Sequence, residues 1–193
     1  MRLKALLATA LLAVPLVASA DPRTEVQRAL EQVVAAGGFR AEVTGAVFGP
    51  GTPPTSGTID VLFPDRIHAR TEVIDFITTP EGAWINLFGV WTPVDSDRIP
   101  VTAFSRSAMR KAIASIGDVH ADGTVMTNRC EEHIYRFRAT GQLPGANADG
   151  DAKISVCAND GRPVRLEATD AASGGHIKLV FDWSRKPEVR TPE

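Results

Sequence analysis

The sequence has few of the residues that metal centres, redox sites and nucleic-acid interfaces need. It holds two cysteines and four histidines, and no histidine stands at zinc-ligand spacing to another histidine or to a cysteine. The cysteines are too far apart for a Cys-x-x-Cys redox motif. The formal net charge is −2 and no Lys/Arg cluster is present, which disfavours nucleic-acid binding. We therefore expect no metal, no cofactor and no nucleic-acid partner.

Motifs of nucleophilic and nucleotide-dependent catalysis are also missing. The chain has no G-x-S-x-G elbow, no S-x-x-K motif and no glycine-rich phosphate loop. Glu131, Glu132 and His133 are adjacent, but neighbours on a strand point to opposite faces, so we interpret them as a solvated strand start. The chain is predicted not to be an enzyme, although catalytic residues distant in sequence could still meet in space.

No apolar run is long enough for a transmembrane helix, which takes about 20 residues. The most apolar segment lies at the N-terminus, where Arg2 and Lys4 precede apolar residues 5–17 and small residues 18–20. This layout is typical of a cleaved signal peptide. We therefore predict a signal peptide at 1–20 and a single periplasmic domain at 21–193, with secretion as the alternative. No cysteine follows the cleavage site, so no lipid anchor is expected there.

The two cysteines, Cys130 and Cys157, are predicted to form one disulfide. Oxidation is the default in an exported protein, and the alternative is two free buried thiols. The bridge would close a loop of 28 residues, counting both ends. The entropy of closing such a loop would stabilise the fold by about 3–4 kcal/mol.

The hydrophobic pattern predicts an α+β fold. Apolar residues recur at helical spacing over 24–36 and again over 104–116, whereas most of the rest alternates with a period of two. Short alternating segments joined by tight turns predict an antiparallel meander of five strands before the second helix and further strands after it. We expect a polar loop at 141–150, a hairpin turn at Asn159-Asp160-Gly161 and a frayed tail at 186–193.

Large apolar side chains concentrate on what the alternation predicts to be one face of a curved sheet. They could fill an ordinary core. Alternatively, a curved sheet of about eight to eleven strands can hold one apolar ligand, with the mid-chain helix as a lid. The predicted lining of this hydrophobic cavity is Phe63, Phe76, Trp84, Phe88, Trp91, Met109, Ile113 and Phe181.

The order of elements and several short motifs resemble the LolA-like superfamily of periplasmic lipoprotein and lipid carriers, which includes LppX/LprG-type proteins. The motifs are G-x-I-x-V-x-F-P-x-R at 57–66, T-P-E-G-A-W-I at 79–85, D-G-R-P-V-R-L-E at 160–167 and I-K-L-V-F-D-W at 177–183. The resemblance covers about residues 23–183. It implies an unclosed β-barrel with a helical lid over a cavity for acyl chains. In LolA an arginine on an inner strand couples lid closure to cargo, and Arg66 and Arg70 are equally good matches for it.

These observations predict a periplasmic carrier or binding protein for a lipid, a lipoprotein acyl chain or another hydrophobic ligand. The alternative is an envelope protein–protein interaction module with a filled core and no ligand. The interior of the sheet distinguishes the two.

Overall fold

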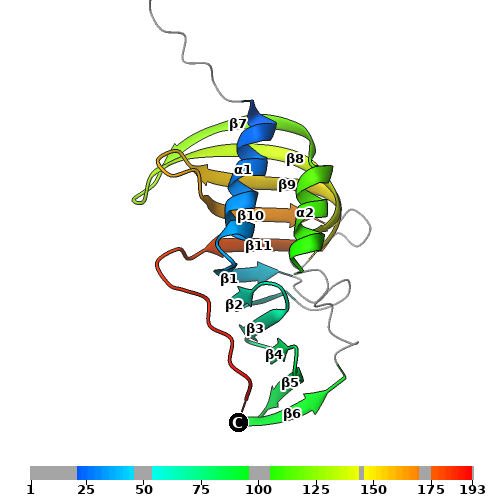
Figure 1. The fold of residues 1–193 in the computed structure, drawn as a ribbon. Helices are drawn as coiled ribbons and strands as arrows, with labels where there is room; N and C mark the ends of the chain where they lie inside the picture. Colours follow the sequence, from blue (N-terminus) through cyan, green and yellow to red (C-terminus); the bar gives the residue numbers. More distant parts are fainter. Residues whose placement is uncertain (1–20, 46–53, 96–104, 144–145, 170–174, 193) are drawn as a thin grey trace, which may run out of the picture.

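The computed structural model describes residues 21–45, 54–95, 105–143, 146–169 and 175–192, and the side chains among these except those of 139–149. The predicted signal peptide at 1–20 lies outside the described residues. The described chain contains two helices and one antiparallel sheet of eleven strands. The strand order is β6-β5-β4-β3-β2-β1-β11-β10-β9-β8-β7. Because β6 and β7 are edges that do not pair with each other in the described part of the chain, the sheet is unclosed, as the sequence predicts (Figure 1).

The elements follow one another along the chain in three groups. A helix and six strands come first: α1 (Pro22–Ala35), β1 (Gly38–Gly45), β2 (Thr55–Leu62), β3 (Arg66–Thr71), β4 (Asp75–Thr79), β5 (Gly82–Leu87) and β6 (Val90–Val94). The second helix is α2 (Arg106–Ser115). Five strands complete the sheet: β7 (Gly117–Met126), β8 (Glu131–Leu143), β9 (Ala146–Cys157), β10 (Pro163–Thr169) and β11 (His176–Phe181).

The first helix begins and ends where local chemistry predicts. The Asp21 carboxylate caps it by accepting a hydrogen bond from the backbone N–H of Thr24 at 3.1 Å, and Pro22 occupies the first turn. Gly37, with φ +79°, turns the chain out of the helix into β1. The apolar stripe is fully buried and consists of Val26, Ala29, Leu30, Val33 and Val34.

The second helix forms in the same way and packs beside the first. The Ser105 hydroxyl accepts from the backbone N–H of Ala108 at 3.2 Å and caps the helix. The Gln27 side chain of α1 donates to the backbone carbonyl of Ile113 in α2 at 3.2 Å, which ties the two helices together. Met109, Ala112 and Ile113 are buried. The mid-chain helix predicted at 104–116 is therefore confirmed.

Both helices lie on the same face of the sheet, which we call the inner face. Their main contacts are with β7–β10 and β1, and Figure 1 shows them crossing this half while β2–β6 extend beyond them. The core is one continuous cluster that runs from the helices across the inner face to β4. Its largest members on the strands include Phe39, Ile59, Ile67, Phe76, Tyr135, Phe137, Ile154, Leu166, Leu179 and Phe181.

Two expectations about the strands are wrong. The five strands predicted before the second helix are six, because Phe88 and Gly89 form a turn with φ +54° and +88° that separates β5 from β6. The polar loop expected at 141–150 is mostly strand, since β8 and β9 pair from Glu132↔Cys157 to Leu143↔Ala146. Cross-strand pairing outweighs local polarity there. The tail expected to fray contains Val189, which is only 7% exposed.

Candidate functional site

The inner face of β2–β5 is mostly apolar, with Thr78 of β4 as a buried polar residue on it. Ile67 and Phe76 are buried on it, and Ile85 pairs with Phe76 across β4 and β5, so the two share this face. Phe63, just after β2, and Ile85 are half-buried and pack at the margin of the core. This surface is continuous with the buried side chains of α2 and with the C-terminal half of the sheet. Of the predicted cavity residues, the structure brings together here Phe63, Phe76, Met109, Ile113 and Phe181.

Two predicted cavity residues lie on the opposite face, the outer face. Trp84 pairs with Ile77 and not with Phe76, so it points away from the helices. Trp91 pairs with Asn86, the residue two after Trp84, and its ring meets the His68 ring edge-to-face at 6.1 Å. The expectation that both tryptophans face inward is wrong. Within β5 the inward positions are those of Ala83 and Ile85, which leaves Trp84 on the other face, and the turn at 88–89 then shifts the alternation by one residue before Trp91.

Phe88 also lies apart from the other predicted cavity residues. It occupies the tip of the β5–β6 hairpin and is fully exposed, at 105% of the reference area. Positive φ at both turn residues is the signature of a type I′ turn, which favours Asn-Gly. A bulky residue at such a φ costs about 1–2 kcal/mol. The inward orientation expected of Phe88 is therefore wrong.

Sequence reasoning missed a row of aromatic rings along one end of the inner face. The Phe39 ring lies 6.5 Å from Phe63 and 5.5 Å from Phe181, and Phe181 stacks on Trp183 at 5.9 Å. An arginine covers each end of the row: the Arg106 guanidinium carbon is 6.0 Å from the centroid of Phe63, and that of Arg162 is 5.3 Å from the centroid of Trp183. Phe63 and Trp183 each stand two positions after the last inward-facing residue of a strand. This repeated pattern could have indicated the row of rings.

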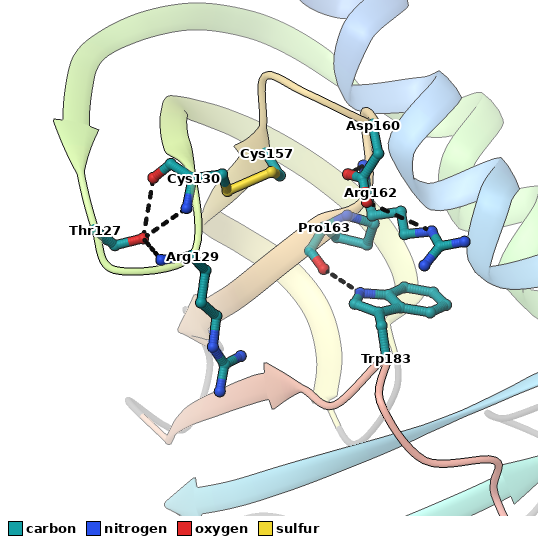
Figure 2. The surroundings of a disulfide bond; sticks show 8 residues. All are labelled: Thr127, Arg129, Cys130, Cys157, Asp160, Arg162, Pro163 and Trp183. Atoms are coloured by element: carbon teal, nitrogen blue, oxygen red, sulfur yellow. Dashed lines mark hydrogen bonds and ion pairs between the residues drawn. A yellow bond between two sulfur atoms is a disulfide. The ribbon is translucent and has the colours of Figure 1, made fainter.

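The Arg162 end of the row adjoins the disulfide. Cys130 and Cys157 are bonded, with Cα atoms 5.8 Å apart, which confirms the predicted bridge. Figure 2 shows the bridge between the start of β8 and the end of β9, with Arg162 and Trp183 beyond the β9–β10 turn. The Trp183 indole N–H donates to the Pro163 carbonyl at 2.7 Å, which fixes its ring.

The outer face of β1–β4 contains a buried ionic cluster. Asp60, which is inaccessible to solvent, accepts from Arg40 at 3.1 Å and from Arg70 at 3.2 Å. Arg66 pairs with Glu81 at 3.0 Å. By register Arg66 and Arg70 share this outer face with Asp60, so neither of the two candidate arginines points toward the helices.

His68 lies beside this cluster and is largely buried. Its side chain is 16% exposed, and its Nε2 lies 3.0 Å from the Asp75 carboxylate. Burial lowers the pKa of His68 below its usual value, and the hydrogen bond to Asp75 opposes that shift. The cross-strand neighbour Ile77 and the Trp91 ring supply the burial.

The structure reveals a polar network where α1 meets the C-terminal half of the sheet. The Tyr135 hydroxyl donates to the Glu25 carboxylate, and His133 Nδ1 lies 3.4 Å from the same hydroxyl. Burial raises the pKa of Tyr135, and the Glu25 carboxylate raises it further. The network lies at a pocket of about 290 Å³. Glu132, expected to be solvated, is buried at 2% exposure, between its cross-strand partners Val125 of β7 and Cys157 of β9.

A second pocket of about 470 Å³ lies across β7–β11 and has a mixed charge. Asp122 bridges Arg136 at 2.9 Å and Lys153 at 3.1 Å near it. The charged residues that line it are Asp118, His120, Arg136, Arg138, Asp151, Lys153, Glu167 and His176. Neither of these pockets is an apolar cavity. Among the described residues no group of three or more His, Cys, Asp or Glu could hold a metal ion, and no helix has the length and hydrophobicity to cross a bilayer.

Comparison with solved structures identifies the fold. The lipoprotein LppX of Mycobacterium tuberculosis superposes with a TM-score of 0.60 at 15% identity, covering 88% of this chain and 98% of LppX. LprF of Mycobacterium bovis also gives 0.60, at 9% identity, covering 90% of this chain and 98% of LprF. No family model matches the chain, and no curated protein matches it in sequence. The LppX-like fold expected from the resemblance is therefore confirmed.

Proposed function

We propose that the chain binds and carries an apolar ligand, such as a lipid or a lipoprotein acyl chain, in the periplasm. The ligand would lie against the inner face of β2–β5, beside α2. The observation that carries this proposal is that the apolar inner face continues beyond the half of the sheet that the two helices cover. The fold shared with LppX agrees with the resemblance of the sequence to LolA-like lipid carriers, and that resemblance supports the same conclusion.

The half-buried residues define where the ligand would enter. Phe63, Ile74 and Ile85 are partly exposed apolar side chains that pack against the core. These apolar side chains stay partly exposed to solvent in the protein alone. The methylenes of a bound ligand would remove that exposure. A chain of about a dozen methylenes would contribute on the order of 10 kcal/mol before ordering costs.

The second helix would act as the lid. Met109 and Ile113 belong to the same core cluster as Phe76, and the guanidinium of Arg106 in the first turn lies 6.0 Å from the centroid of the Phe63 ring. The main contacts of α2 are with β8 and α1, so Arg106 reaches from the covered half of the sheet toward the proposed ligand surface. Movement of α2 would remove this cover from Phe63.

A pair of neighbouring residues offers a matched test. Ile85 lies on the inner face of β5, and Trp84 lies on the outer face. Binding of a fluorescent fatty acid is measured by titration for Ile85→Gln and Trp84→Gln, with the melting temperature as a folding check. We expect Ile85→Gln to weaken binding about tenfold, because a polar group meets the ligand's methylenes. Trp84→Gln should stay within about twofold of the wild type.

Native mass spectrometry of the purified protein should also show co-purifying lipid. A clean apo mass together with no response to the fatty-acid probe would reject the proposal. Equal losses in the two variants would reject the inner face as the site.

A protein-binding role is the second candidate. The edge strand β7 has ten residues and exposes most of its side chains, including Val125 and Met126, so it could accept a strand from a partner. Pull-down from an envelope extract with and without Val125→Pro would test this, since proline blocks strand addition at an edge.

A further inference from the structure

The tip of the β5–β6 hairpin exposes the largest concentration of apolar side chains in the described part of the chain. We propose that this tip docks on the surface of a lipid bilayer, where the ligand is collected or delivered. This inference deepens the proposed function and rests on it. The exposed fractions are 51% for Leu87, 105% for Phe88 and 65% for Val90.

A fourth exposed apolar residue stands at the same end of the sheet. Val73, in the turn between β3 and β4, is 63% exposed. Because β3 and β5 run in the same direction, their C-terminal turns lie at the same end of neighbouring hairpins. Val73 therefore adds an exposed apolar side chain at this end, beside the exposed Glu72, whose carboxylate accepts from the Ser56 hydroxyl at 2.6 Å.

Folding does not account for the aromatic at the tip. The turn requires positive φ at Phe88 and Gly89, and the Asn86 side chain accepts from the backbone N–H of Gly89 at 2.8 Å to hold it. Asparagine suits the first turn position better than phenylalanine does. Phe88 touches no core cluster and gains no burial. Its benefit must therefore come from something outside the chain.

The chemistry of the tip suits a bilayer. Residues 87–91 carry no charge, so entry into the interface removes no ion from water. Trp91, half-buried, follows directly behind the exposed tip, and tryptophan prefers the level of the lipid headgroups. Leu87 and Val90 pair across the hairpin on the inner face, in line with Ile85. An apolar path therefore leads from the tip to the proposed ligand surface, as delivery from a bilayer requires.

The test uses flotation with phosphatidylcholine vesicles and a chain that starts at Asp21, which contains every described residue. Phe88→Asn removes the aromatic and suits the turn, so its melting temperature should equal or exceed that of the wild type. We expect its vesicle partitioning to fall about tenfold and its uptake of a labelled fatty acid from vesicles to slow similarly. Its affinity for the same probe in solution should not change.

Met126→Asn is the matched control, because Met126 is 72% exposed at the other edge of the sheet. It should leave partitioning and uptake unchanged. Equal partitioning of wild type and Phe88→Asn, no partitioning of the wild type, or a dimer that Phe88→Asn dissolves in sedimentation velocity would each overturn the inference. Wild-type partitioning that Phe88→Asn reduces, with no probe binding in solution, would reject the ligand site and uphold the docking tip.

Discussion

The two halves of the sheet use the same alternating pattern to different ends. In the C-terminal half, β7–β11, the inner face packs against α1 and α2, and the Cys130–Cys157 bridge ties β8 to β9. In the N-terminal half, β2–β6, the inner face is also largely apolar, but the helices make their main contacts elsewhere. Its outer face holds the Asp60 cluster and two tryptophans. The helices and the bridge stabilise one half, and the proposed ligand surface lies in the other.

This difference shows why the number of apolar residues in each strand does not identify a ligand-binding surface. The inner faces of β10 and β3 are equally buried, with Leu166 at 2% and Ile67 at 1% exposure. What separates them is the distance from the helices, which the order of strands decides. Three measurements can break or sharpen the comparison.

The largest effect is expected from the disulfide. Replacing Cys130 and Cys157 together by serine should lower the free energy of unfolding by about 3–4 kcal/mol, because the open loop gains entropy in the unfolded chain. Urea unfolding measures it. Binding of the fatty-acid probe should be retained, since the bridge lies in the C-terminal half. An unchanged free energy of unfolding would show that the bridge adds nothing to this half.

A smaller effect is expected from a single core truncation under the helices. Leu30 lies on α1 and is 2% exposed. Leu30→Ala should lower the free energy of unfolding by about 3 kcal/mol, because the cavity left between helix and sheet cannot collapse. Ile85 is half-buried, so Ile85→Ala should lower the free energy of unfolding by about 1 kcal/mol. Equal costs in urea unfolding would remove the distinction between the two halves.

The smallest effect is expected from pH. Burial lowers the pKa of His68 in the folded state, so the unfolded chain takes up this proton first, near the usual value of 6.5. The neutral histidine's contribution to stability is full above that pH and is lost as pH falls through the folded-state pKa. His68→Gln should therefore flatten the stability profile as pH falls below about 7. The exposed His176→Gln is the control, and a parallel profile for both variants would contradict the assignment.

Prediction from sequence succeeded for features that depend on residues close together in the chain. Helix 24–36, helix 104–116 and the antiparallel strands follow from periodicity, the open sheet follows from the family resemblance, and the cysteine pair follows from export chemistry. Prediction failed at the β5–β6 hairpin, where Phe88–Gly89 lacks the usual Asn-Gly signal. The missed two-residue turn misplaced Phe88 and Trp91, whereas Trp84 was assigned to the wrong face within β5 itself.

By itself, then, the sequence determined the two helices, the disulfide and the class of fold, because hydrophobic period and cysteine number act along the chain. Only the tertiary structure decided which half of the inner face the helices cover, which side of β5 Trp84 occupies and where Arg40, Asp60 and Arg70 meet. Those outcomes depend on strand order and register, and both are set by contacts between residues far apart in the chain.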